Sequence, residues 1–307
     1  MGISPIYNRI IIDLSHADDK ENDAFLNVSL PFEQFIIMNY LSDNNSLSLR
    51  SISDSPSSKH HNKRIIDAYF QGGEGIITII NGQPTVRRSA GFSAIDIVTS
   101  KEYLITSAHT LFNLREPIDI YHAPWYPPFT RRDPLFHFGI VSHIQFNGVD
   151  FALIEKQNND YKLSPMIRSS VVEHPSPPSE IIDDFFESPP PVGHHICISG
   201  YDSHTSCGEV TSVDTEYRYP GRRNTVFHSM IRANMPAKYG DIGGPAFSID
   251  NVSHRVTVHG IVTNLNFFRG GGYIVVLQPI RGIVNYGPTM NFTQNLLFID
   301  LKSFGML

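Results

Sequence analysis

The chain has 307 residues, of which 41% are hydrophobic and 18% are charged, and its formal net charge is −6. This composition can bury a large core, which excludes general disorder, and its acidic balance gives no reason to expect a nucleic-acid partner. No apolar run approaches the roughly 18 residues of a membrane helix. The 22 glycines and 21 prolines favour many turns over long helices, so an all-β fold is expected.

The first 70 residues differ in pattern from the rest. Residues 8–14 are rich in β-branched side chains and predict a strand, whereas residues 31–41 have helical spacing with Pro31 in the first turn and predict an amphipathic helix. Residues 42–63, rich in Ser, Asn and Asp, predict a polar linker. We therefore expect a small α+β segment over residues 1–70.

Short β-rich runs separated by glycine and proline follow from residue 72, as is typical of a sandwich or barrel. In the first half these runs cover residues 75–80, 93–98, 103–107, 118–121, 139–144 and 149–154. Six prolines between residues 173 and 192 interrupt the pattern and predict a connector between two halves. The second half has runs around Cys197 and over residues 208–213, 226–232, 245–249, 256–262 and 273–278.

Three segments carry side chains suited to catalysis. His109 follows an apolar strand that ends in small residues, and Asp150 opens another apolar strand. In Gly240-Asp-Ile-Gly-Gly-Pro, glycines on both sides of one side chain allow backbone N–H groups to converge on a developing oxyanion. Each feature alone also has an ordinary explanation, as a polar residue at a strand end or in a turn. The two cysteines, Cys197 and Cys207, are either free thiols or a pair.

Taken together and in order, these motifs resemble those of the trypsin/chymotrypsin-like serine proteases, in particular the streptogrisin and alpha-lytic protease branch. The resemblance rests on Thr106-Ser-Ala-His-Thr, Val149-Asp-Phe-Ala-Leu, the two cysteine segments and the glycine loop. It implies two packed six-stranded antiparallel β-barrels with a cleft between them. The implied protease-like domain spans residues 71–292, with barrel one at 72–165, barrel two at 192–292 and a tail at 293–307.

The resemblance also implies residue roles. His109 corresponds to the general base and Asp150 to the carboxylate that orients it, while the N–H groups of Gly240 and residue 242 correspond to the oxyanion hole. Cys197 and Cys207 correspond to a disulfide-bonded pair. The position of the serine nucleophile is Ile242, whose side chain has no lone pair to attack a carbonyl carbon. We therefore expect the chain to be inactive in hydrolysis.

The strand that aligns substrate in the family corresponds to Thr263, Asn264 and Leu265. Thr263 occupies the place of a serine whose hydroxyl faces the triad aspartate, so that hydrogen bond is expected to persist. Leu265 occupies the place of a glycine at the mouth of the primary specificity pocket, which it is expected to narrow or close. Residues 1–70 stand where relatives carry an N-terminal pro-region, and are interpreted as its retained remnant.

The functional hypothesis is a catalytically inactive serine-endopeptidase-like protein that binds a peptide or protein in the inter-barrel cleft. One alternative is an active secreted serine endopeptidase, if Ile242 is not the natural residue, and another is a structural or interaction module with a closed cleft. No cofactor is expected, and no metal, since the adjacent histidines at 60–61 and 194–195 would point to opposite faces of a strand. We expect a monomer with no nucleic-acid or membrane partner. The resemblance suggests secretion, although the first residues lack the features of a signal peptide.

Overall fold

The computed structural model divides the chain into two compact units, Met1–Ala68 and Tyr69–Leu307. It describes three strands in the first unit and most of residues 68–300. The gaps within that second range are residues 81–82, 110, 113, 124, 126–134, 171–178, 187, 220–224, 251–252, 254, 268–272 and 287–295. No helix in the described residues is long and apolar enough to cross a membrane.

The first unit contains a three-stranded sheet built from β1 (Gly2–Ser4), β2 (Arg9–Leu14) and β3 (Ile36–Tyr40). β2 pairs antiparallel with β1 and parallel with β3, so the strand predicted over residues 8–14 is confirmed. The helix predicted over residues 31–41 is wrong in its second half, where β3 lies. The two consecutive isoleucines that begin β3 favour a strand, and β2 supplies a partner rich in isoleucine. The linker predicted over residues 42–63 lies outside the described residues.

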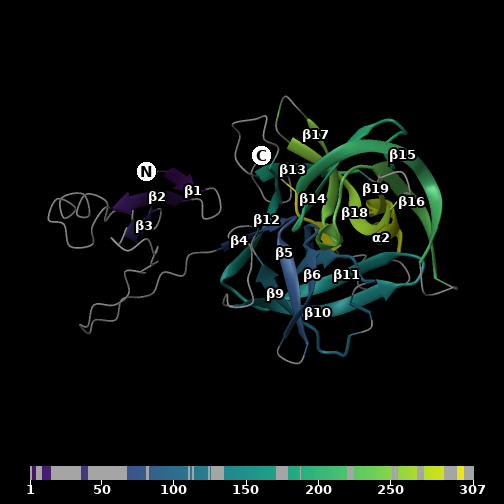
Figure 1. The fold of residues 1–307 in the computed structure, drawn as a ribbon. Helices are drawn as coiled ribbons and strands as arrows, with labels where there is room; N and C mark the ends of the chain where they lie inside the picture. The colour runs from purple at the N-terminus through teal and green to yellow at the C-terminus, as the bar shows by residue number, and fades with distance from the viewer. Residues whose placement is uncertain are drawn as a thin grey trace. The chain divides into compact units, whose positions relative to one another are not determined.

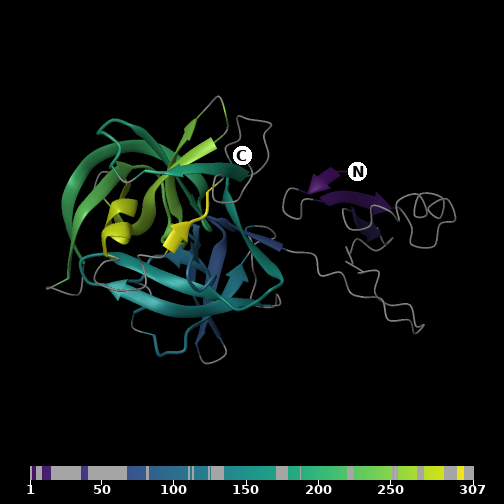
Figure 2. The same ribbon diagram turned by 180° about the vertical axis from the view of Figure 1, so that it is seen from behind.

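The second unit consists of two packed β-sheets, drawn mainly in blue to teal and in green to yellow in Figure 1 and seen from behind in Figure 2. The first sheet has eight strands in the order β20-β7-β8-β11-β10-β9-β5-β6. Their bounds in chain order are β5 (Gly75–Ile80), β6 (Gln83–Ser89), β7 (Ser93–Asp96), β8 (Glu102–Thr106), β9 (Asp119–Ala123), β10 (Phe136–Phe146), β11 (Asp150–Lys156) and β20 (Leu296–Phe298).

The second sheet has nine strands in the order β17-β14-β15-β16-β19-β18-β13-β12-β4. Their bounds are β4 (Ala68–Gly72), β12 (Tyr161–Arg168), β13 (Ser179–Phe185), β14 (His195–Gly200), β15 (His204–Arg218), β16 (Val226–Asn234), β17 (Pro245–Asp250), β18 (Arg255–Phe267) and β19 (Tyr273–Pro279). A further pairing of β17 with β18 closes six of these strands into a ring. A 3-10 turn, η2 (Tyr239–Asp241), precedes β17, and helix α2 (Ile280–Tyr286) follows β19.

The predicted all-β architecture of two packed barrels is confirmed, and each run of residues predicted as a strand coincides with one of these strands. The sequence pattern missed others. β6 contains two arginines and a proline and lacks a simple alternation. β13 lies inside the predicted connector at residues 173–192 and pairs in parallel with β18, so that sheet is not purely antiparallel. β20 lies in the predicted tail and extends the first sheet through β7.

A hydrophobic cluster joins the two sheets. It combines Phe92 and Phe151 from the first half of the unit with Phe247, Val258 and Ile261 from the second, all fully buried. Burial of this apolar surface is the main force that packs the two sheets together. The loops after β8 and before β17 therefore start from a fixed framework, and both of these loops carry predicted site residues.

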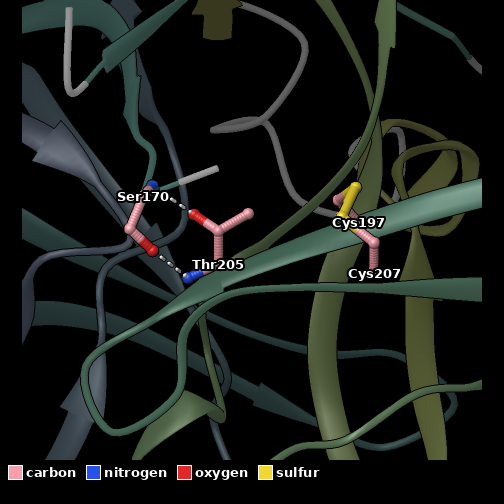
Figure 3. Close-up of a disulfide and its surroundings, with 4 residues drawn as sticks. All are labelled: Ser170, Cys197, Thr205 and Cys207. Atoms are coloured by element: carbon pink, nitrogen blue, oxygen red, sulfur yellow. Dashed lines mark hydrogen bonds between the residues drawn. A yellow bond between two sulfur atoms is a disulfide. The ribbon is translucent and has the colours of Figure 1, made fainter. Parts of the chain in front are cut away.

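The disulfide implied by the resemblance is confirmed. Cys197 in β14 and Cys207 in β15 are directly paired across the hairpin and are joined by a disulfide (Figure 3). Near the turn of the same hairpin, Ser170 and Thr205 exchange hydrogen bonds, since each backbone N–H donates to the other's hydroxyl oxygen at 2.8 and 3.2 Å. These contacts fix the hairpin to the chain that follows β12.

A buried ion pair connects the start of the first sheet to the second. The guanidinium of Arg168, at the end of β12, donates to the Glu74 carboxylate at 2.9 Å, and a ring nitrogen of His122 in β9 lies 3.2 Å from the same carboxylate. Burial alone would raise the pKa of Glu74, but these two neighbours and hydrogen bonds to its charged form hold it below the ordinary value. Glu74 therefore stays ionised inside the protein.

Candidate active site

His109 and Asp150 come together as the sequence motifs predict. His109 follows β8 and Asp150 is the first residue of β11, which pairs antiparallel with β8. The Nδ1 atom of His109 lies 3.1 Å from an Asp150 carboxylate oxygen, and the backbone N–H groups of Ala108 and His109 donate to the other oxygen at 2.8 and 2.9 Å. Asp150 is fully buried and His109 is 8% exposed. The carboxylate thus fixes the orientation of the imidazole, with Nδ1 towards it.

Ser107 completes this arrangement from two residues before the histidine. Its hydroxyl donates to Asp150 at 2.7 Å, and its oxygen lies 2.8 Å from His109 Nδ1. The backbone N–H of Asp150 donates in turn to the side-chain oxygen of Gln278 at 3.1 Å. Within the part of the chain that the structure describes, His109 Nε2 makes no hydrogen bond. The His109–Asp150 pair is therefore assembled with no hydroxyl at Nε2 among the described residues.

Aromatic rings surround the histidine. The rings of Tyr219 and Phe146 lie 5.5 and 6.4 Å from the His109 ring, centre to centre. Phe146 also stacks on Phe112 at 4.3 Å and packs against Phe227 at 5.3 Å. Tyr219 and Phe227 belong to the chain around the far end of the β15–β16 hairpin. That hairpin therefore reaches from the second sheet to the histidine of the first.

The loop that carries position 242 is held by the carboxylate of Asp241. This fully buried side chain accepts hydrogen bonds from the backbone N–H groups of Lys238, Asp202 and Ser203 at 2.7, 3.0 and 2.8 Å. A charged acceptor with three N–H donors stabilises one conformation of the loop strongly. Asp241 thus fixes the 3-10 turn η2 directly before Ile242.

Ser89, at the end of β6, ties the same loop to the first sheet. Its N–H donates to the Ile242 carbonyl at 2.9 Å, its hydroxyl donates to the Gly240 carbonyl at 2.7 Å, and its own carbonyl accepts from Thr106. Gly243 has a positive φ of 94°, and a Cβ there would lie 2.2 Å from the Thr106 hydroxyl. The close approach of loop and sheet therefore requires glycine at 243.

The two N–H groups expected to form an oxyanion hole are already bonded within the chain. Gly240 N–H donates to the Asp202 carboxylate at 3.0 Å, and Ile242 N–H donates to the Tyr239 carbonyl at 3.4 Å as part of the 3-10 turn. A Cβ on Gly240 would come within 2.3 Å of the Asp202 carboxylate, which shows how closely that group covers the amide. Neither donor is directed at an open position in this conformation, contrary to the expectation from the sequence.

The side chain of Ile242 is part of the core of the second barrel. It is 1% exposed and belongs to a cluster with Met235, Ala237, Val262 and Leu265. Leu265, expected to narrow the specificity pocket, is itself only 4% exposed in this cluster. Positions 242 and 265, to which the sequence resemblance assigns the nucleophile and the pocket mouth, thus both contribute hydrocarbon to one packed interior.

The substrate-aligning strand also differs from its expected hydrogen bonding. The Thr263 hydroxyl is buried and has no partner among the described residues, so the expected bond to Asp150 is absent; Ser107 makes a bond to that carboxylate instead. The side-chain amide of Asn264 donates to the Tyr217 hydroxyl, and its oxygen accepts from the Leu265 N–H at 2.6 Å. Burial raises the pKa of Tyr217 to about 12, so this hydroxyl remains a neutral partner.

Comparison with known proteins agrees with this fold. A family model described as Trypsin matches residues 139–286. The trypsin-family match thus covers 148 of the 307 residues. A search of curated proteins found no match.

Among solved structures, Thermobifida fusca protease A is 19% identical with a TM-score of 0.53, covering 76% of this chain and 100% of its own. A Nocardiopsis protease is also 19% identical, with a TM-score of 0.52 and coverage of 75% and 99%. A Cellulomonas bogoriensis chymotrypsin is 18% identical, with a TM-score of 0.50 and coverage of 76% and 99%. At these identities the likeness establishes the fold of the trypsin-family domain.

Three residues of the site were not predicted from the sequence. Ser107 stands inside the histidine motif, so a hydroxyl two residues before the histidine was an available signal. Asp202 and Tyr219 had no local signal, because they reach the trypsin-family site from other strands and loops. In the described part of the domain, one cluster of metal-ligand atoms is found, at His195, Cys197 and Cys207. Its two sulfur atoms form the disulfide and are not available as thiolates.

Proposed function

We propose that the trypsin-family domain is a non-catalytic module that binds a peptide or protein segment on the surface around His109. The observation that carries this proposal is the state of the loop at residues 240–242. Its nucleophile position is a buried isoleucine, and its two oxyanion donors are bonded to Asp202 and Tyr239. Two separate requirements of acyl transfer are therefore missing at once.

The size of each loss supports the absence of catalysis. Removing the nucleophile of a serine protease costs on the order of 10⁶ in turnover, and removing one oxyanion donor costs about 10²–10³. Ser107 does not replace the nucleophile, because it is 2% exposed and its hydroxyl is directed at Asp150. The remaining His109–Asp150 pair holds a proton acceptor in place, which alone does not cleave a peptide bond.

The position of the binding surface follows from which part of the site is already filled by the protein's own side chains. Leu265 and Ile242 occupy the interior where the family's specificity pocket would open, so a ligand side chain is not accepted there. The Tyr219 ring lies 5.5 Å from the His109 ring, and Tyr219 and Tyr239 are electrostatic neighbours of Arg88. Tyr239 is 58% exposed, and an exposed aromatic side chain beside polar groups is a common feature of protein-binding surfaces. We place the ligand on the surface beside Tyr219 and Tyr239.

Two alternatives are distinguished by specific observations. The buried state of Leu265 and the aromatic rings packed near His109 favour a purely structural module whose binding site is closed. An active endopeptidase requires that Ile242 not be the natural residue, and sequencing codon 242 from the source genome tests this directly.

The proposal is tested by retention of peptides from an unbiased synthetic library on the immobilised full chain, with mass spectrometry of the retained material. We expect retained peptides of unchanged mass, with no casein hydrolysis above that of a His109→Ala variant. Cleavage that disappears in His109→Ala would establish catalysis. Retention no higher than on a heat-unfolded sample would support the closed structural module and overturn the proposal.

A further inference from the structure

The hairpin of β14 and β15 gathers four side chains of metal-ligating type around its disulfide. Cys197 in β14 pairs directly with Cys207 in β15, and His195 pairs with Glu209 two positions further along. Directly paired residues of an antiparallel hairpin share one face, and so do residues two apart on one strand. The four side chains therefore form two adjacent cross-strand pairs on the same face.

The donor atoms of three of these side chains are already close together. One ring nitrogen of His195 and the Sγ atoms of Cys197 and Cys207 all lie within 4.8 Å of one another. Tetrahedral zinc, with Zn–S bonds of about 2.3 Å and Zn–N bonds of about 2.0–2.1 Å, places its ligand atoms roughly 3.5–3.8 Å apart. Three donors gathered this closely can share one zinc ion once the bond between the sulfurs is broken.

This cluster runs from the core to the surface. Cys197 is fully buried, Cys207 is partly buried, and His195 and Glu209 are both exposed. Among the described residues, neither the His195 ring nor the Glu209 carboxylate has a hydrogen-bond or ion-pair partner. Both groups can therefore turn towards the sulfur atoms, and the exposed end of the face gives an ion a path from solvent.

We propose that this hairpin holds a zinc ion when its disulfide is reduced, with both cysteines, His195 and Glu209 as the ligands. Thiolate sulfur and imidazole nitrogen suit zinc, whereas magnesium and calcium take oxygen ligands, and a carboxylate is an accepted fourth ligand of zinc. The two states of the hairpin, disulfide and zinc-bound, exclude each other because they use the same two sulfur atoms. The site is independent of peptide binding at His109.

The change from disulfide to zinc site balances as an exchange with a dithiol reductant. One thiolate of the reductant attacks the sulfur of Cys207, the less buried of the two, and releases Cys197 as a thiolate. The second thiol of the reductant then displaces Cys207 and closes the reductant's own disulfide, so two electrons and two protons pass to the protein. Zinc replaces the two thiol protons, which pass to solvent.

The test compares the full chain in its oxidised form with the full chain reduced by a phosphine that is then removed without oxygen. Co²⁺ is titrated as a spectroscopic probe, because thiolate ligands give an intense sulfur-to-metal absorption band that nitrogen and oxygen ligands alone do not. Zn²⁺ is then added in competition. We expect the reduced chain to bind one ion, with a Zn²⁺ Kd of about 1 μM or tighter, and the oxidised chain to give no such band.

The adjacent histidines supply matched variants. His195→Ala and Glu209→Gln should each weaken Zn²⁺ binding by at least about 10-fold, since even the loss of a partner outside the ligand shell costs about 10- to 100-fold. His194→Ala should change the Kd by less than about 3-fold, because the His194 ring lies 6.3 Å from the His259 ring, centre to centre, and is not among the clustered donors. The fluorescence of the buried Trp125 reports that each variant is folded.

The test also covers a reduced chain that unfolds without metal. Zn²⁺ should then restore the Trp125 emission of the oxidised protein, as coupled metal binding and folding requires. No thiolate band in the reduced chain, or equal losses of affinity in His195→Ala and His194→Ala, would overturn the site, and an unchanged Kd in Glu209→Gln would overturn the set of four ligands. Each of these results leaves the proposed peptide-binding function standing.

Discussion

Replacing Ile242 by alanine should destabilise the protein as a core mutation does. The sequence resemblance assigns this position to a reactive hydroxyl, whereas here the side chain is 1% exposed and packs with Leu265 and Val262. The change removes three carbons, worth about 0.8 kcal/mol each on burial, and leaves a cavity. The total is roughly 2–5 kcal/mol, and Ile242→Val should cost only about 0.5–1.5 kcal/mol.

Urea unfolding followed by tryptophan fluorescence measures this effect. Trp125 is the only tryptophan of the chain and is buried in the second unit, so its signal reports on the folding of that unit. The control is Ile97→Ala, at a position 62% exposed, which should change the unfolding free energy by less than about 0.5 kcal/mol. If Ile242→Ala changed the unfolding free energy as little as that control, Ile242 would not be a core residue, and position 242 would not be filled by packed hydrocarbon.

Three further variants test other parts of the structure. Replacing Cys197 and Cys207 by alanine should lower the unfolding free energy by about 2–3 kcal/mol, as expected for a loop with a separation of 10 residues, and an unchanged midpoint in urea would contradict this. Gly243→Ala should cost several kcal/mol through its positive φ and the contact with Thr106, so a melting temperature equal to the parent's would speak against the close packing of the loop. Glu74→Gln should cost about 3–5 kcal/mol at pH 7 by leaving Arg168 unpaired. Because the folded-state pKa of Glu74 is lowered, its contribution to stability is present above the ordinary value of 4.5 and is lost as the pH falls below that value. The unfolding free energies of parent and variant should therefore converge in acid. A constant difference between them from pH 7 to pH 3 would contradict this.

The parts of the fold that local pattern determines were predictable. Buried strands such as β5 and β11 are short apolar runs bounded by turn residues, and the His109 and Asp150 motifs lie directly beside such strands. β6 and β13 were missed because their polar residues conceal the alternation, and β13 also pairs with β18, which is distant in sequence.

The hydrogen bonding within the site was less predictable from the sequence than the identity of the site residues. The acceptor for the Gly240 amide, Asp202, lies 38 residues away, and no local pattern indicates that its carboxylate covers this group. The hydrogen bond to the Asp150 carboxylate was expected from Thr263 but is made by Ser107. Only the folded chain decides which of the two hydroxyls reaches this acceptor, so the local sequence does not indicate it. Sequence motifs thus identify the positions of a site more readily than its hydrogen bonds.

We propose that two independent blocks, the isoleucine at 242 and the bonded oxyanion donors, keep this domain from acting as a protease. The direct measurement is labelling by a fluorophosphonate probe of four folded proteins: the parent, Ile242→Ser, Ile242→Ser with Asp202→Ala, and that double variant with His109→Ala. We expect no labelling of the parent, little labelling of Ile242→Ser, clear labelling of the double variant, and loss of that labelling when His109 is replaced. Labelling of the parent, or equal labelling of Ile242→Ser and the double variant, would contradict it.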